Sequence, residues 1–118
     1  AKTKNMYYVK KRLEISASHQ LHLSYESKCE NLHGHNWIIT VYCRAKDLNR
    51  DGMVIDFSVI KNVIKEKLDH KNLNDILPFN PTAENMAKYF YEKIRILGYN
   101  MKAVTVYETP VNSATYME

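Results

Sequence analysis

The sequence has no run of about 18 consecutive apolar residues, the length that a membrane-spanning helix requires. No apolar block follows the basic N-terminus, so the sequence predicts neither a membrane partner nor a secretory signal peptide. We therefore expect a cytoplasmic protein. The chain has only two cysteines, Cys29 and Cys43. They could form one disulfide, but a reducing compartment favours two free thiols.

The basic residues do not gather into a patch. The net charge is +4, but the lysines are spread along the chain. This distribution is typical of a solvated surface and does not indicate a nucleic-acid partner. A basic protein would still attract a small polyanionic substrate.

No internal repeat and no domain boundary interrupts the 118 residues. The apolar and charged contents are those of an ordinary globular protein, so extensive disorder is not expected. We interpret residues 1–118 as one domain with a single core.

Alternating apolar residues predict four strands. The first covers residues 7–18 and is followed at once by His19, and the second covers residues 36–45. Two further strands are predicted at residues 101–108 and 113–117.

Two helices are predicted between the second and third strands. Asp56 caps the first, whose apolar positions recur with a 3.6-residue period between residues 57 and 68. Thr82 caps the second, and Glu84 lies in its first turn, where a carboxylate interacts favourably with the helix dipole. Gly98 ends this helix.

The order of elements is strand, strand, helix, helix, strand, strand, which indicates an α+β fold. It fits a four-stranded antiparallel sheet with two helices on one face. Such a sheet has two unpaired edge strands. Because pairing with another subunit would remove these edges, a homo-oligomer is expected.

Most of the candidate chemistry lies in the stretch Cys29-Glu30-Asn31-Leu32-His33-Gly34-His35-Asn36-Trp37. If His33 and His35 open a strand, their side chains point to the same face and can bind one metal ion. His19 and His22 are both candidates for a third ligand. Three histidines leave a fourth position open, which is the layout of a catalytic zinc. An isolated His-x-His motif often ends a loop without binding metal, but the nearby cysteine favours the metal site.

Several short motifs occur together and in order. They are Ser16-Ala17-Ser18-His19, Cys29-x-x-x-His33-Gly34-His35-Asn36, Ile55-Asp56-Phe57, Leu68-Asp69-His70-x-x-Leu73-Asn74, Asn80-Pro81-Thr82-x-Glu84 and Glu108-Thr109. Through these motifs the chain resembles the 6-pyruvoyltetrahydropterin synthase/6-carboxytetrahydropterin synthase family over nearly its whole length. The resemblance implies the tunnelling fold (T-fold), whose trimers close their sheets into a barrel and whose hexamers stack two trimers.

The spacing between the cysteine and the His-Gly-His motif separates branches of this family. This chain has three intervening residues, and in this spacing it resembles the 6-carboxytetrahydropterin synthases of queuosine and 7-deazapurine biosynthesis. The pyruvoyl synthases of the biopterin pathway usually have a longer spacer. The resemblance therefore implies a zinc-dependent carbon–carbon lyase that converts 7,8-dihydroneopterin triphosphate to 6-carboxytetrahydropterin, acetaldehyde and triphosphate. A pyruvoyl synthase is the alternative, and a zinc-stabilised binding module without turnover is an alternative of another class.

The resemblance also selects the metal ligands. His19, His33 and His35 would hold Zn²⁺, and His22 would belong to the loop or to the surroundings of the site. The metal would bind the hydroxyl groups of the substrate side chain and acidify them.

Further roles are implied for residues outside this triad. Cys29 would be the general base. Asp69 and His70 would form a second proton-transfer pair, completing a site contributed by a neighbouring subunit. Glu108 would anchor the pterin ring by accepting hydrogen bonds from N3–H and the 2-amino group, with assistance from Thr109.

Overall fold

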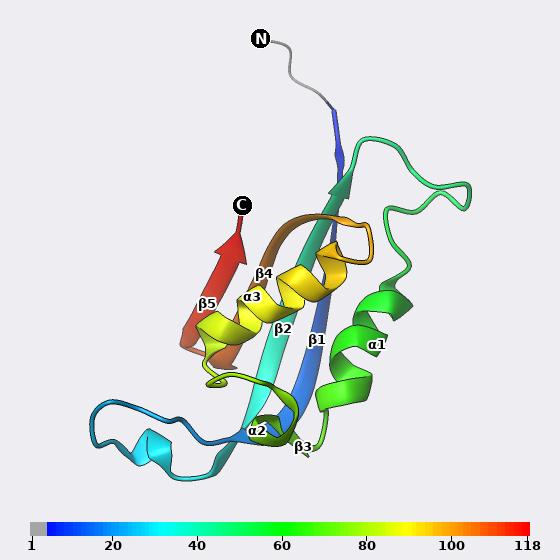
Figure 1. Ribbon diagram of the computed structural model, residues 1–118. Helices are drawn as coiled ribbons and strands as arrows, with labels where there is room; N and C mark the ends of the chain where they lie inside the picture. Colours follow the sequence, from blue (N-terminus) through cyan, green and yellow to red (C-terminus); the bar gives the residue numbers. More distant parts are fainter. Residues whose placement is uncertain (1–4) are drawn as a thin grey trace.

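A computed structural model describes residues 5–118 and shows a twisted sheet with its long helices on one face (Figure 1). Both long helices lie between the second and fourth strands in the chain, as the sequence predicts. The elements are β1 (Tyr7–His19), η1 (Lys28–Glu30), β2 (His33–Ala45), α1 (Phe57–Leu68), β3 (Lys71–Asn72), α2 (Leu73–Ile76), α3 (Ala83–Arg95), β4 (Asn100–Thr109) and β5 (Asn112–Met117).

The prediction of a four-stranded antiparallel sheet with two helices is wrong in the number of strands and helices. The sheet has five strands in the order β3-β1-β2-β4-β5, and β3 runs parallel to β1. The short helix α2 follows β3 directly. Both added elements are too short, at two and four residues, for an apolar period to reveal them. Each neighbouring pair among the four long strands is antiparallel, as predicted.

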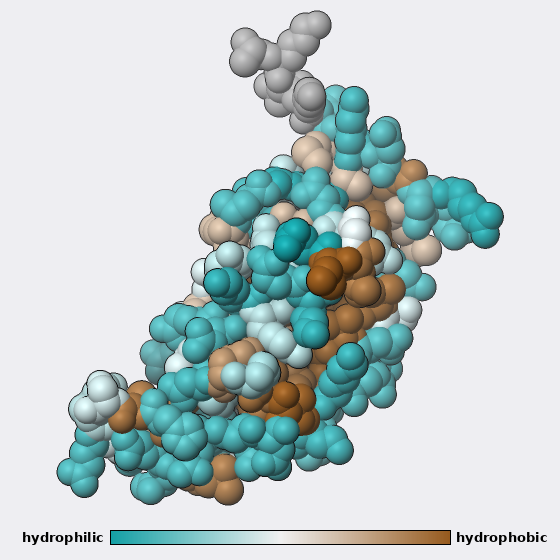
Figure 2. All heavy atoms as spheres, viewed as in Figure 1, coloured by the Kyte–Doolittle hydropathy of each residue, from teal (hydrophilic) through white to brown (hydrophobic). Residues whose placement is uncertain are grey.

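The core lies between the sheet and the two long helices. Trp37, Ile39, Val41 and Cys43 alternate along β2 and are fully buried. Helix α1 packs on β1, while α3 packs on β4 and β5. Figure 2, in the same view, shows apolar side chains along the seam between the two helices, within a mostly hydrophilic surface. The other face of the sheet carries no helix from residues 5–118.

The predicted helix starts are confirmed. The Asp56 carboxylate accepts a hydrogen bond from the Ser58 N–H at 2.9 Å, and the Thr82 hydroxyl oxygen accepts one from the Asn85 N–H at 3.1 Å. Helix α3 ends three residues before Gly98, whose φ of 102° is readily reached only by glycine. No helix among residues 5–118 is long and apolar enough to cross a membrane.

The second strand begins earlier than predicted, at His33 instead of residue 36. The loop between β1 and β2 projects beyond the end of the sheet and carries η1 (Figure 1). Because β1 ends at His19 and β2 starts at His33, the sheet itself ends in histidines.

Candidate metal centre and active site

Three histidine rings converge where β1 and β2 end. The strand register places His19 opposite His33 and Ala17 opposite His35. One nitrogen of each ring lies within 4.8 Å of the other two. This spacing allows the three imidazoles to bind a single metal ion.

Backbone carbonyls fix a proton on Nδ1 in two of these rings. Nδ1 of His19 lies 2.8 Å from the Pro81 carbonyl oxygen, and Nδ1 of His33 lies 2.6 Å from that of Asn31. A carbonyl can only accept, so each Nδ1 must donate and each neutral ring presents a lone pair at Nε2. Metal-binding histidines are commonly oriented by such a bond at the other ring nitrogen.

The Nε2 atoms of the three rings are not well satisfied by protein hydrogen bonds within residues 5–118. Nε2 of His19 and Nε2 of His33 are 3.0 Å apart, so two lone pairs face each other. Nε2 of His35 is buried and has no hydrogen-bond partner among residues 5–118. A buried polar atom without a partner is costly. A cation bound by all three nitrogens would remove both problems, so the residues fit a metal ion.

Burial also favours the neutral form of two of the three imidazoles. It lowers the pKa of His19, against the opposing effects of the hydrogen bond to Pro81 and the charge of Glu108. Burial likewise lowers the pKa of His35, where Glu108 opposes the shift and His33 adds to it. Metals bind the neutral imidazole, so these shifts favour His19 and His35 as metal ligands.

Trp37 forms the wall behind the cluster. Its indole N–H donates to the Ala17 carbonyl at 3.2 Å. Its ring meets those of His19 and His35 edge-on, with centroids 4.9 Å and 5.3 Å away. The first core side chain of β2 therefore restricts the positions of two candidate ligands.

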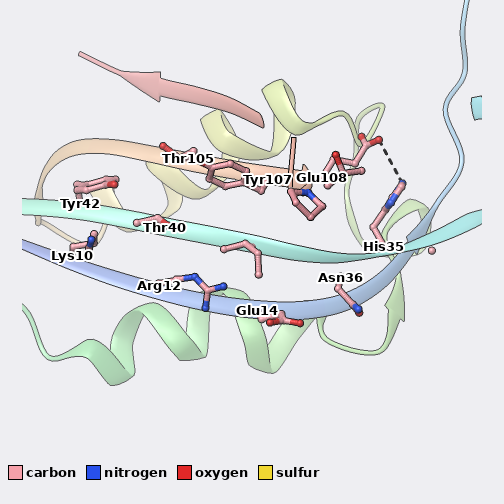
Figure 3. A pocket seen from close by; sticks show the side chains of 14 residues that line it. Lys10, Arg12, Glu14, His35, Asn36, Thr40, Tyr42, Thr105, Tyr107 and Glu108 are labelled. Carbon is pink, nitrogen blue, oxygen red and sulfur yellow. Dashed lines mark ion pairs between the residues drawn. The ribbon is translucent and has the colours of Figure 1, made fainter. Parts of the chain in front are cut away.

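Glu108 reaches the cluster from β4, beside an irregularity in the pairing with β5. The register shifts between Tyr107 and Thr109, so Glu108 has no directly opposed partner. Such bulges redirect side chains next to active sites. The Glu108 carboxylate lies 3.5 Å from Nε2 of His35 (Figure 3). The Thr109 hydroxyl oxygen accepts hydrogen bonds from the N–H groups of residues 111 and 112, which stabilises the turn between β4 and β5.

Asp69 and His70 are tied to β1. The Asp69 carboxylate accepts from the Ser16 N–H at 2.8 Å, and the His70 N–H donates to the Ser16 carbonyl at 2.6 Å. Asp69 also lies 3.5 Å from Nε2 of His70. His70 has a φ of 62°, a strained value that the two bonds to Ser16 help to maintain. Its ring is 80% exposed, which leaves it accessible to substrate or to another subunit.

Two grooves meet at Gly34, His35 and Asn36. The larger has a volume of about 840 Å³ and runs along the helix-free face of the sheet (Figure 3). The smaller, of about 430 Å³, includes His70. The larger groove is also lined by side chains that no sequence motif marks as functional: Lys10, Arg12, Glu14, Thr40, Tyr42, Thr105 and Tyr107. They alternate with core residues, and only the strand order shows that they share a groove.

Cys29 and His22 lie apart from this arrangement. Among residues 5–118, the metal-ligand cluster consists of His19, His33 and His35. Cys29 is half-buried in η1, and the structure does not bring it into the histidine cluster. The backbone of His22 is held by Asn80, so its place in the loop is fixed without its ring.

The 6-pyruvoyl tetrahydropterin synthase family profile matches residues 8–118. The chain belongs to this family. It is 36% identical to a 6-carboxy-5,6,7,8-tetrahydropterin synthase of Synechocystis, over 94% of this chain and 93% of the relative. It is 32% identical to a 6-pyruvoyl tetrahydrobiopterin synthase of Drosophila melanogaster, over 92% of this chain and 78% of the relative.

A solved member of the family has the same fold. The structure of 6-pyruvoyl tetrahydropterin synthase from Caenorhabditis elegans superposes with a TM-score of 0.78 at 30% identity, covering 97% of this chain and 96% of the other. The family predicted from the motifs is therefore confirmed. Membership places the chain among tetrahydropterin synthases, and relatives of both branches occur.

We expect about one divalent metal ion per chain, with Zn²⁺ as the probe. His33→Ala should abolish tight binding, because it removes one of three ligands. His22→Ala should bind like the wild type, since its ring lies outside the cluster. Metal content after dialysis, with circular dichroism to check folding, measures both. A folded His33→Ala protein that retained its metal, or a His22→Ala protein that lost it, would contradict the ligand assignment.

Proposed function

We propose that this chain is a zinc-dependent 6-carboxy-5,6,7,8-tetrahydropterin synthase acting in queuosine or 7-deazapurine biosynthesis. The reaction consumes 7,8-dihydroneopterin triphosphate and one water, and releases 6-carboxytetrahydropterin, acetaldehyde and triphosphate. The observation that carries the proposal is the convergence of three histidine rings on one point beside the Glu108 carboxylate. The 36% identity to the Synechocystis enzyme supports this branch, as does the three-residue spacer after Cys29.

His19, His33 and His35 are the proposed zinc ligands. The bonds from Nδ1 of His19 and His33 to backbone carbonyls leave Nε2 of both rings available. When bound, zinc would act as a Lewis acid toward the hydroxyl groups of the substrate side chain. Three protein ligands would leave the metal open to the substrate.

Glu108 is the proposed pterin anchor. Its two carboxylate oxygens match the paired N–H donors of the ring, as in other bidentate contacts. Its place in the larger groove beside His35 would hold the pterin next to the metal. Thr109 supports this anchor by fixing the turn that follows, and its hydroxyl proton is still available to a ligand.

Cys29 and the Asp69–His70 pair are the proposed proton-transfer groups. Cys29 takes a proton from the substrate side chain as general base, and Asp69 orients the His70 imidazole for the second transfer. His70 is mostly exposed, and Cys29 lies outside the histidine cluster of its own chain. Both features suit a site that is completed when subunits assemble.

The assembly we propose is a homohexamer made of two trimers. Within residues 5–118, the outer edge of β5 has no partner strand, and β3 covers β1 only at Ala17 and Ser18. Joining these edges between three copies would close the sheets into a barrel, the arrangement implied by the family resemblance. Native mass spectrometry should find six copies; a stable monomer that still turns over would exclude a shared site.

A second candidate is 6-pyruvoyltetrahydropterin synthesis, since the Drosophila relative carries that name at 32% identity. This reaction eliminates triphosphate and retains all three side-chain carbons. Incubation of the zinc-loaded protein with 7,8-dihydroneopterin triphosphate, followed by mass spectrometry, separates the candidates. We expect 6-carboxytetrahydropterin and an equal amount of acetaldehyde. A pyruvoyl product would support the second candidate, and no product from zinc-loaded protein would favour a binding module.

Two substitutions should separate binding from catalysis. Glu108→Gln keeps the size of the side chain but loses its charge, so it should weaken substrate binding by about 2–5 kcal/mol and raise KM.

Cys29→Ala should leave zinc content and oligomer unchanged but lower kcat about 10²–10⁴-fold, the usual contribution of a general base. Steady-state kinetics measures both. An unchanged KM for Glu108→Gln would remove this residue from the site, and wild-type kcat for Cys29→Ala would transfer the base role to another group.

A further inference from the structure

Two asparagine side chains extend the edge of the sheet where β3 stops. The Asn74 carboxamide oxygen accepts from the Gln20 N–H at 2.7 Å, and its nitrogen donates to the Gln20 carbonyl at 2.8 Å. Asn80 does the same with His22, at 2.9 Å and 3.1 Å. Each side chain thus replaces one peptide unit of a neighbouring strand.

The contacts made by Asn74 and Asn80 continue the hydrogen-bonding pattern along the outer edge of β1. Alternate residues of an extended strand direct their N–H and C=O groups to the same side. Ser16 is bonded to Asp69 and His70 on this side, and Ser18 pairs with β3. Gln20 and His22 are the next two alternate residues, beyond the end of β1. The four contacts therefore cover one continuous backbone edge between residues 16 and 22.

Both asparagines are themselves held by secondary structure. Asn74 lies in α2, where its N–H donates to the Asn72 side chain at 3.1 Å. The Asn80 carbonyl accepts from the Thr82 N–H at 2.8 Å and from the Asn85 side chain at 2.9 Å, at the start of α3. The carboxamides are thus presented from fixed positions.

The residue between the two contacts connects this edge to Cys29. Leu21 faces the opposite side of the segment and donates its N–H to the Cys29 carbonyl at 3.0 Å. The Cys29 N–H in turn donates to the Ser27 hydroxyl oxygen at 3.2 Å. Segment 20–22 therefore bonds to the asparagines along one edge and to the cysteine-bearing turn along the other.

We propose that Asn74 and Asn80 are positioning residues that hold Cys29 in its catalytic location. This inference rests on the proposed function, in which Cys29 is the base. Through Ser16, the same edge of β1 also holds Asp69 and His70, so both proton-transfer groups share one support. A misplacement of about 1 Å can cost about 10²-fold in rate, which makes such a support consequential for turnover.

Asn74→Asp and Asn80→Asp test the proposal. Each variant keeps the acceptor but loses the donor and places a carboxylate against a backbone carbonyl. Asn49→Asp is the matched control, because within residues 5–118 the Asn49 side chain bonds through its oxygen alone, which accepts from the N–H groups of residues 51 and 53. The measurements are kcat and KM from steady-state kinetics, the zinc content, the rate of Cys29 alkylation by iodoacetamide, and the hydrogen-exchange rate of the Leu21 amide.

For Asn74→Asp and Asn80→Asp we expect kcat to fall about 10–100-fold with little change in KM or zinc content. Leu21 exchange and Cys29 alkylation should both accelerate, while Cys43 stays unreactive because burial raises its pKa to about 11. The control should match the wild type in every measurement.

Wild-type kcat in both test variants would overturn the proposal, and so would a loss of activity that merely follows a loss of zinc. Unchanged exchange and alkylation would also overturn it. If the wild type itself gave no product, the proposed function would fail. The exchange and alkylation rates would then decide by themselves whether the asparagines hold the Cys29 turn.

Discussion

The pairing of β1 with β2 is the interaction on which the rest of the structure depends. All 13 residues of β1 are paired, from Tyr7 opposite Ala45 to His19 opposite His33. A slip of one residue would turn every side chain of a strand to the other face. It would therefore expose the core residues of β2 and separate the histidines at once. Burial of that core thus specifies the geometry of the metal centre.

The same pairing creates a conflict that a metal ion would resolve. The His19 ring is fully buried, and burial disfavours its charged form, so protonation of this ring is an unfavourable way to stabilise the cluster. The ring nitrogens nevertheless converge without donors between them. Neutral imidazoles with lone pairs aimed at one point are suited to a cation, and Glu108 adds negative charge nearby.

The outer edge of β1 gathers the remaining candidate groups. Segments from residues 69 to 80 bond in turn to residues 16, 18, 20 and 22, first by backbone and carboxylate, then by β3, then by two carboxamides. A two-residue strand would be a weak element by itself. The side chains of Asn74 and Asn80 extend β3, which explains how so short a strand can support both Asp69–His70 and the loop that carries Cys29.

The sequence by itself determined the four long strands, the two long helices and their caps, because apolar periods and capping residues act locally. It also determined the family, since motifs such as His33-Gly34-His35 keep their order along the chain. Only the tertiary structure decided that β3 and α2 exist, that Glu108 follows a shift in register, and that Asn74 and Asn80 bond to residues 20 and 22. The pairing of β3 with β1 and the two asparagine contacts join residues more than 50 positions apart, and no local pattern encodes which distant backbone groups an asparagine will meet.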